Sequence, residues 1–312
     1  MSIDSILKEV MQLRASDLYL LPYQSKYQLK CHSQGRSHLL RQLSLEEAHQ
    51  FIATIKYRSE MNISESRRPQ LGRFTFENIW IRVSTVGDFL DRETLVLRFI
   101  YDQQGGLNWL LSDQFETLKV GLPDAGLFVI AGPTGSGKTT TLYELLRQFQ
   151  KERLILTIED PVEIYEPNFV QLQVNEAAGI GYQELIKVAL RHRPEILLVG
   201  EIRDQATAKA ALQAALSGHL VLSTIHALSA QDVRLRLLEL GVDAGQLDVA
   251  LQGTIYQRLL PAVDQKIAAL AEFWFKQDQQ LSNTWEEGLY AALQAKKITS
   301  ATYQQFKKVQ TT

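Results

Sequence analysis

Apolar positions in the first hundred residues change between the spacing of a helix and the alternation of a strand. From Ile3 to Ala15 they recur three and four residues apart, which predicts an amphipathic helix. A second helix is predicted from Ser44 to Tyr57, because Ser44 and Glu47 have the spacing of a capping box. Strands are expected at residues 15–20, 26–31, 72–76, 79–86 and 94–100. This combination predicts a small α+β domain over residues 1–100.

Residues 101–107 are polar and rich in glycine, which predicts a linker. Beyond it, from residue 108 to 312, apolar strand-like runs alternate with helical patterns. Strands are expected at 127–131, 154–158, 196–199 and 220–225, with helices at 140–146, 182–191 and 205–217. Such alternation predicts an α/β domain with a mostly parallel sheet and helices on both faces. The pattern weakens after residue 234, where helices at 233–240, 245–251, 286–295 and 302–309 and a strand at 267–275 are expected.

Composition narrows the class of protein. The 312 residues favour two domains over one, and 45% apolar and 22% charged residues suit a globular chain. The formal net charge of −2 gives no overall attraction to nucleic acid or anionic lipid. A single cysteine, Cys31, rules out an internal disulfide and a cysteine-based zinc site within one chain. No apolar run approaches membrane-spanning length and the first residues do not form a signal peptide, so we expect a cytoplasmic protein that reaches a membrane only through a partner.

The expected strand at 127–131 runs into a phosphate-binding pattern. Residues 132–139 read Gly-Pro-Thr-Gly-Ser-Gly-Lys-Thr, the G-x-x-x-x-G-K-T of a P-loop, and a predicted helix follows. Glycines let the backbone curl so that N–H groups face inward at a helix N-terminus. Lys138 places a charge against the outer phosphates, and the Thr139 hydroxyl can ligate Mg²⁺. The alternative is a glycine-rich turn without a ligand. The predicted nucleotide-binding residues are Gly132, Pro133, Thr134, Gly135, Ser136, Gly137, Lys138, Thr139 and Thr140.

Acidic residues follow two other strands of the same predicted sheet. The run 196–199 leads through Gly200 to Glu201, the form of a Walker B strand, although glycine holds the place often taken by aspartate. Glu201 is expected to orient the attacking water or to hold Mg²⁺ through water. The strand 154–158 leads to Glu159 and then Glu163, either of which could share water activation with Glu201. The alternatives are an exposed strand-end acid and a solvated acidic turn that begins at Asp160.

His226 and three arginines complete the candidate residues. His226 ends the predicted strand 220–225, where a neutral imidazole could sense the γ-phosphate; the alternative is a satisfied core histidine. Arg73, Arg82 and Arg98 lie in strands of the first domain. They either form the charged outer face of a sheet or reach a nucleotide bound to a neighbouring subunit, as arginine fingers do.

These motifs together resemble those of the type II secretion and type IV pilus ATPases. The similar stretches are the P-loop at 132–139, an aspartate box at 157–163, a Walker B segment at 190–204 and a histidine box at 217–230. In the first domain, residues 15–18 are similar to a motif near the start of the family's core. Residues 71–74 and 82–85 lie where family members carry interfacial arginines. The resemblance covers about residues 2–261, and the combination of motifs is very specific.

The resemblance implies a RecA-like P-loop ATPase domain preceded by a PAS-like α+β domain. It also implies a ring-shaped homo-hexamer that binds ATP and Mg²⁺ between the two domains of each chain. Arg73 and Arg82 would supply charge in part across a subunit boundary, and Glu201, Glu163, Glu159 and His226 would serve hydrolysis. Rotation of one domain on the other would be passed to an inner-membrane platform protein that adds or removes pilin subunits.

Departures from the family pattern narrow the subtype. The chain begins at the core, and Tyr19 stands where histidine is usual. It lacks the four-cysteine zinc insertion of many members, so no zinc is expected. A helical motif that is usual near the C-terminus of retraction motors is absent. The chain therefore looks most like the members that assemble a competence pseudopilus for DNA uptake, with pilus retraction or protein secretion as alternatives.

Three functions outside this class of motor stay open as alternatives. A nucleic-acid translocase of RecA type is one, although the near-neutral charge argues against direct contact with nucleic acid. A nucleotide-gated binding protein with little turnover and a P-loop kinase are the others.

Overall fold

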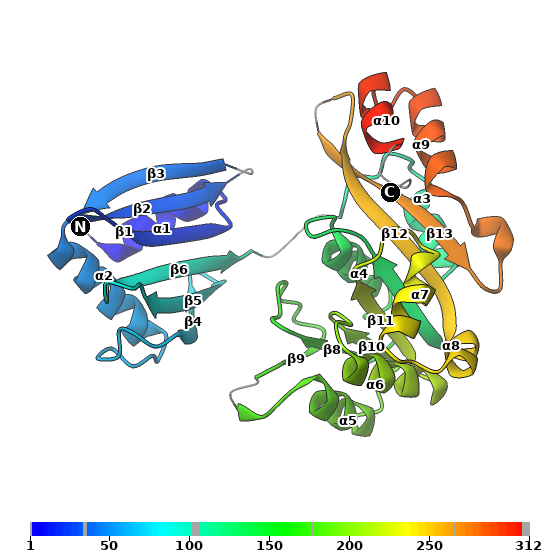
Figure 1. The fold of residues 1–312 in the computed structure, drawn as a ribbon, viewed down its shortest axis with the longest axis horizontal. Helices are drawn as coiled ribbons and strands as arrows, with labels where there is room; N and C mark the ends of the chain where they lie inside the picture. The colour runs from blue at the N-terminus through cyan, green and yellow to red at the C-terminus, as the bar shows by residue number, and fades with distance from the viewer. Residues whose placement is uncertain (1, 34–35, 102–105, 176–177, 265, 308–312) are drawn as a thin grey trace. The chain divides into compact units, whose positions relative to one another are not determined.

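The computed structural model describes residues 2–33, 36–101, 106–175, 178–264 and 266–307. The chain divides into two compact units, drawn in Figure 1. One comprises Met1–Gln103 with Glu163–Tyr165, and the other comprises Gln104–Val162 with Glu166–Thr312. Of the predicted linker 101–107, residues 102–105 lie outside the described residues. We describe each unit by itself.

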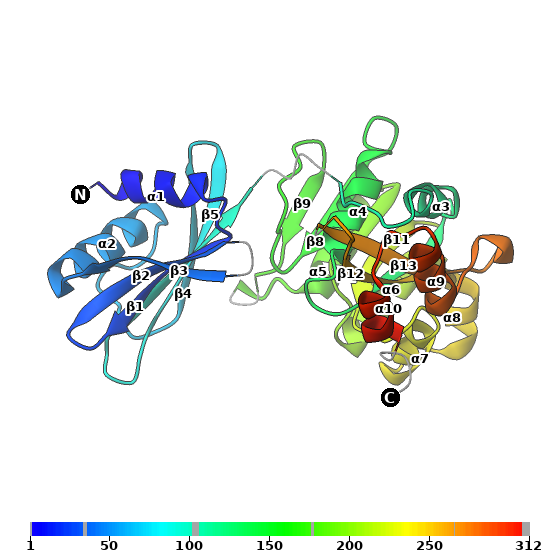
Figure 2. The ribbon, with the colours of Figure 1, turned by 90° about the horizontal axis from the view of Figure 1, so that it is seen from above.

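The described part of the first unit forms a six-stranded antiparallel sheet in the order β3-β2-β1-β6-β5-β4. Helices α1 and α2 lie on one face of this sheet (Figure 2). The bounds are α1 Ile3–Gln12, β1 Asp17–Tyr23, β2 Lys26–Ser33, β3 Arg36–Leu43, α2 Leu45–Arg58, β4 Gln70–Phe76, β5 Ile79–Gly87 and β6 Glu93–Ile100.

Alternation explains why this sheet has one covered face. Leu18, Leu20 and Leu29 are buried against the helices, while the residues between them are mostly less buried. The predicted capping box of α2 is confirmed, since the Ser44 hydroxyl accepts from the Glu47 N–H at 3.2 Å and the Glu47 carboxylate accepts from the Ser44 N–H at 2.8 Å. Strand β3 was not predicted, because most of its described side chains are exposed or half-buried and show no apolar alternation.

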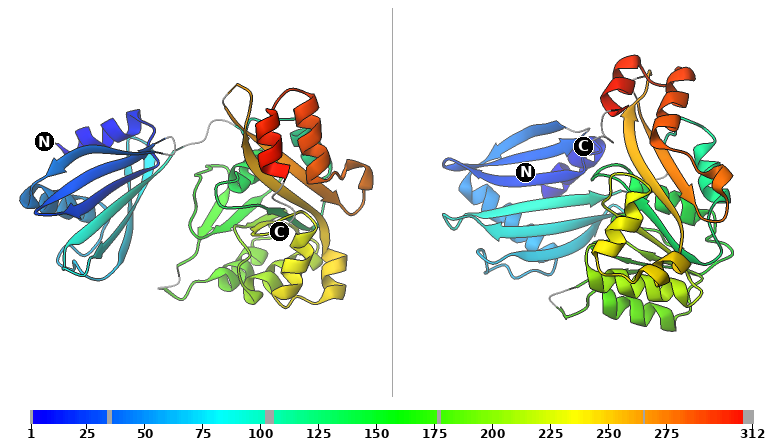
Figure 3. Two further views of the ribbon diagram at one scale, coloured as in Figure 1. Left: turned by 45° about the horizontal axis from the view of Figure 1, so that its top comes forward. Right: turned by 45° about the vertical axis from the view of Figure 1, so that its right-hand side comes forward.

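The described part of the second unit contains a seven-stranded sheet in the order β13-β12-β7-β11-β10-β8-β9 (Figure 1, Figure 3). Its strands are parallel except β13, which runs antiparallel to β12. The strand bounds are β7 Gly126–Ala131, β8 Ile155–Glu159, β9 Val170–Gln173, β10 Ile196–Val199, β11 Leu220–Ile225, β12 Leu251–Pro261 and β13 Ile267–Phe275. The helices are α3 Gln114–Val120, α4 Lys138–Arg147, α5 Tyr182–Arg191, α6 Gln205–Leu216, α7 Asp232–Glu239, α8 Ala244–Ala250, α9 Trp285–Gln294 and α10 Ser300–Lys307, with a short 3-10 helix at Gln279–Leu281.

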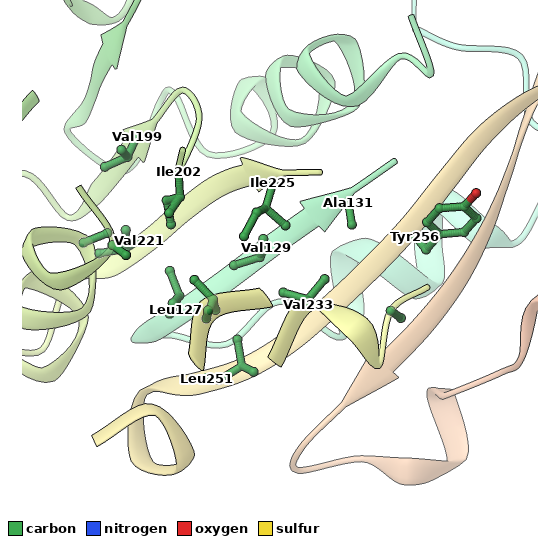
Figure 4. Packing of buried hydrophobic residues seen from close by; sticks show 14 of the residues in the cluster. Leu127, Val129, Ala131, Val199, Ile202, Val221, Ile225, Val233, Leu251 and Tyr256 are labelled. Carbon is green, nitrogen blue, oxygen red and sulfur yellow. The ribbon is translucent and has the colours of Figure 1, made fainter. Parts of the chain in front are cut away.

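The central strands of this sheet are buried at every position. Leu127, Val129 and Ala131 of β7 point to the same side as Ile225 and pack under α6, α7 and α8 (Figure 4). Phe128 and the other alternate residues of β7 are equally buried, and α3 and α4 lie on that side. Strands covered on both faces read as continuous apolar runs, which is why these strands were predictable.

Strand β12 is the main element that the sequence did not predict. Its residues Gln252, Gly253 and Gln257 interrupt the apolar pattern, and a register shift separates Leu251 from Gly253. The strand nevertheless lies beside β7, with Tyr256 paired to Ala131. Strand β9 and helix α3 were also not predicted. The C-terminal helix expected at 302–309 is α10, and residues 308–309 lie outside the described residues.

Candidate active site

The P-loop connects the end of β7 to the start of α4. Gly137 is the N-cap of α4 and has a φ of +84°, a left-handed conformation that side chains disfavour. Because this N-cap residue is a glycine, it has no side chain that could accept from the first N–H groups of α4. These N–H groups and the helix dipole make the loop suited to an anion.

Two side chains of the loop also fit a phosphate ligand. The Ser136 hydroxyl is buried and has no hydrogen-bond partner among the described residues, and such a group suits a phosphate oxygen. The Lys138 ammonium donates to the carbonyl of Gly132 at 2.9 Å and to that of Pro133 at 3.0 Å. Lys138 therefore lies against the loop instead of extending into solvent. Pro133 and Thr134 belong to this loop, and Thr139 and Thr140 lie in the first turn of α4.

Glu201 and His226, both predicted from strand ends, lie together. Glu201 follows β10 and His226 follows β11, and their side chains meet with Nε2 of His226 3.1 Å from Oε1 of Glu201. The other carboxylate oxygen of Glu201 lies 2.6 Å from Nη2 of Arg203. The Glu201 side chain is 17% exposed, so these two contacts fix its orientation.

The strand order brings these residues to the end of the sheet that carries the P-loop. Strand β11 pairs with β7 on one side and with β10 on the other, all in parallel. The P-loop, His226 and Glu201 therefore follow three neighbouring strands at their carboxyl ends. Ligands of open parallel sheets bind at this end. A carboxylate placed there can orient a water or accept its proton.

Arg203 was not singled out as a site residue from the sequence. Its hydrogen bond to Glu201 raises the pKa of the Arg203 guanidinium, which keeps it charged. Its only sequence signal is its position two residues after Glu201 in the Walker B stretch. Arg203 therefore places a positive charge against the carboxylate of Glu201.

Glu159 takes part in a buried hydrogen-bond network. Its Oε1 accepts from the Tyr143 hydroxyl at 2.6 Å and from the Thr157 hydroxyl at 2.7 Å, and Glu159 is only 4% exposed. Gln171 of β9 donates to the Tyr143 hydroxyl at 2.7 Å. Burial, and then the charge of Glu159, raise the pKa of the Tyr143 hydroxyl. These contacts link β8 and β9 to α4. No sequence motif pointed to Tyr143, and a catalytic role of Glu159 stays a prediction.

Glu163 does not join these residues within the second unit. It is exposed and lies in the segment Glu163–Tyr165, which groups with the first unit. A role of Glu163 in water activation stays a prediction.

The arginines of the first unit form a row across its sheet. Arg73 pairs with Arg82, and Arg82 pairs with Arg98, as direct cross-strand partners. Asp17 is the next partner in the row, and its Oδ1 accepts from Nε of Arg98 at 2.8 Å. The Arg73 guanidinium lies 5.4 Å from the ring centre of Trp80. Like charges directly opposite each other are unfavourable, so a row of three arginines beside one aspartate suits an anionic ligand.

The chain belongs to the family of type II/IV secretion system proteins, which matches residues 1–307. It is 40% identical over 259 residues to the competence protein ComGA of Streptococcus pneumoniae, covering 82% of each chain. It is 34% identical over 266 residues to ComGA of Bacillus subtilis, covering 82% of this chain and 74% of the relative. The type IV pilus assembly ATPase TfpB of Acinetobacter baylyi is 36% identical to this chain over 298 residues. This chain spans 50% of the length of TfpB.

Solved structures confirm the predicted fold class. The crystal structure of the pilus retraction motor PilT with bound ADP superposes with a TM-score of 0.79 at 23% identity, covering 98% of this chain and 96% of PilT. The ATPase DotB of Legionella pneumophila gives a TM-score of 0.75 at 22% identity, covering 98% and 95%. The shared fold is an antiparallel α+β unit followed by a mostly parallel α/β unit. The family match over residues 1–307 and the relatives named above confirm the resemblance to the type II secretion and type IV pilus ATPases.

Proposed function

We propose that the chain is an ATP-hydrolysing motor that powers assembly of a competence pseudopilus for DNA uptake. The observation that carries the catalytic part is the placement of the P-loop, His226 and Glu201 at the carboxyl ends of three adjacent parallel strands. The similarity to ComGA over 82% of both chains supports the competence role. The ATPase domain in this proposal is 108–312, preceded by an α+β domain at 1–100 and a linker at 101–107.

The proposed hydrolysis assigns a task to each part of the site. The N–H groups of the P-loop and the Lys138 ammonium would bind the phosphates of ATP, and the Thr139 hydroxyl would hold Mg²⁺. The metal ion would supply positive charge next to the phosphate oxygens. The Glu201 carboxylate orients the attacking water and accepts its proton, while Arg203 and His226 hold that carboxylate in place.

The proposed assembly is a homo-hexamer acting on an inner-membrane platform protein. Arg73 and Arg82 reach a nucleotide held partly by a neighbouring chain and stabilise charge on the γ-phosphate. Glu163, Glu159 and His226 assist hydrolysis. Among the described residues, no helix combines the length and the apolar character needed to cross a bilayer. The proposal places the motor at the cytoplasmic face of the membrane through its partner, with no direct contact to nucleic acid and no zinc.

Glu201→Gln tests the catalytic proposal. The amide keeps the size of the side chain but cannot accept a proton, so we expect turnover to fall by at least about 100-fold while ATP still binds. Phosphate release and equilibrium binding of ATP would be measured on the same samples. The matched control is Glu195→Gln, since Glu195 is exposed and immediately precedes the same strand at its opposite end.

Two outcomes would refute the proposal. An unchanged ATPase rate in Glu201→Gln would leave a nucleotide-gated binding protein with little turnover as the better reading. Hydrolysis that depends on added DNA and falls steeply with salt would instead favour a nucleic-acid translocase.

A further inference from the structure

Strand β12 borders the P-loop although more than a hundred residues separate them in sequence. Ile255 pairs with Ile130 and Tyr256 pairs with Ala131, so Gln257 lies beside the first residue of the loop. A Cβ atom added to Gly132 would lie 2.3 Å from the carbonyl oxygen of Gln257. The close approach of β12 therefore requires glycine at the first position of the motif.

The side chain of Gln257 joins two parts of the P-loop region. Its Nε2 donates to the backbone carbonyl of Ser136 at 2.7 Å, and its Oε1 accepts from the Thr141 hydroxyl at 2.7 Å. A carbonyl can only accept, so the amide nitrogen must face Ser136. One amide thus fixes both the loop before Gly137 and the first turn of α4 after Lys138.

These contacts lie in the interior of the unit. Gln257 and Thr141 are both 0% exposed, and Ser136 is 3% exposed. Loss of the Gln257 amide would leave the Ser136 carbonyl and the Thr141 hydroxyl without this partner in a place with little access to water. The strand that carries Gln257 pairs with β7 on one side and β13 on the other, so the amide is held on a rigid support.

We infer that Gln257 is a positioning residue for nucleotide binding. It holds the Ser136 carbonyl and the start of α4 in the arrangement in which the intervening N–H groups bind phosphate, and it does not touch the nucleotide. Without it, the loop would occupy other conformations, and the apparent affinity would fall by the fraction of time spent in them. This inference rests on the proposed nucleotide site.

The test separates positioning from stability with two variants of the full chain, titrated with Mg·ADP. Gln257→Leu removes the amide, and we expect ADP to bind about tenfold more weakly and the unfolding midpoint without nucleotide to fall. Adding Thr141→Val removes the hydroxyl that the first change leaves unpartnered. The double variant should therefore recover part of the loss in the unfolding midpoint but none of the affinity, because the Ser136 carbonyl still lacks its donor.

The matched control is Gln252→Leu, the same change on the same strand. The Gln252 amide donates to the carbonyl of Val249 at 2.7 Å and makes no described hydrogen bond to the P-loop. ADP affinity should stay at the wild-type value in this control.

Four results would contradict either the positioning role of Gln257 or the proposed function. Affinity that recovers together with the unfolding midpoint in the double variant would show that Gln257 serves stability alone. Gln257→Leu with unchanged ADP affinity, or Gln252→Leu with an equal loss, would overturn the positioning role. A wild-type chain that binds no ADP would instead refute the proposed function.

Discussion

The two sheets of the molecule carry their polar candidate residues in different places. In the mostly parallel sheet, Glu201, His226 and the P-loop follow strand ends, because helices cover both faces. In the antiparallel sheet, helices cover one face, and Arg73 and Arg82 are cross-strand partners on the other. A sheet buried on both sides can present chemistry only at its ends, whereas a sheet covered on one side can present it along a whole face. The candidate residues therefore lie at strand ends in one unit and at alternate strand positions in the other.

Lys138→Ala tests the end of the parallel sheet and should have the largest effect. Removing the ammonium that lies against the loop takes away the cation for the outer phosphates. We expect nucleotide affinity to fall by at least about 100-fold and hydrolysis to be lost, as measured by titration and phosphate release. The control is Lys187→Ala on α5, which removes an exposed lysine of the same unit and should bind as wild type. Unaltered ATP affinity in Lys138→Ala would remove the central assignment.

Arg82→Ala tests the face of the antiparallel sheet that the helices do not cover, and it should have an intermediate effect on activity. An arginine that stabilises transition-state charge contributes mainly to turnover, so we expect hydrolysis to slow roughly 100-fold while affinity changes less than about threefold. Arg68→Ala, at an exposed site of the same unit, is the control.

A mixing experiment shows whether Arg82 acts between chains. Subunits with Arg82→Ala keep Glu201, and subunits with Glu201→Gln keep Arg82, so mixed rings should regain activity at interfaces that combine the two. Absence of rescue at any ratio would mean that Arg82 acts within its own chain or only supports the fold.

Glu272→Gln tests the buried interior of the mostly parallel sheet and should have the smallest effect on activity, because it acts on stability alone. Glu272 lies on β13 with 5% exposure, and burial raises its pKa to about 7, although the Ala230 N–H donates to the carboxylate and opposes this. The folded state therefore holds a proton between pH 4.5 and about 7 that the unfolded chain releases.

The direction of the pH dependence follows from that raised pKa. The stabilising contribution is fully present below pH 4.5, the ordinary pKa, and is lost as the pH rises through about 7. Relative to Glu272→Gln, wild type should lose on the order of 3 kcal/mol of unfolding free energy across this range. Denaturant unfolding at pH 5 and pH 8 measures the difference, with Glu239→Gln on α7 as an exposed control. A wild type that parallels Glu272→Gln at both pH values would contradict the prediction.

Sequence patterns were informative where local pattern and topology coincide. The P-loop lies between an apolar run and a helix, and parallel strands place every carboxyl end together, so Glu201 and His226 could be expected to meet. Arg203 and Tyr143 could not be expected, because their partners are set by side-chain direction within the folded unit. The grouping of Glu163 with the first unit likewise depends on tertiary structure.

Strand β12 shows why polar residues can hide a buried strand. Gln257 interrupts the apolar pattern of 251–261, yet it is fully buried because the P-loop supplies its hydrogen-bond partners. Strand β3 escaped prediction for the opposite reason, since it lies at the edge of its sheet with few buried side chains. In both cases the backbone pairing is settled by neighbours far away in sequence.

The ring motor is tested most directly by the ATPase rate as a function of protein concentration, with mass measured by light scattering on the same samples. Wild type and Glu201→Gln would be compared. The account predicts a specific rate that rises as a species of about six times 35.4 kDa assembles, and no rate in the variant. A specific rate that is constant with concentration, from a monomer, would mean that each chain holds a whole active site and would contradict the ring motor.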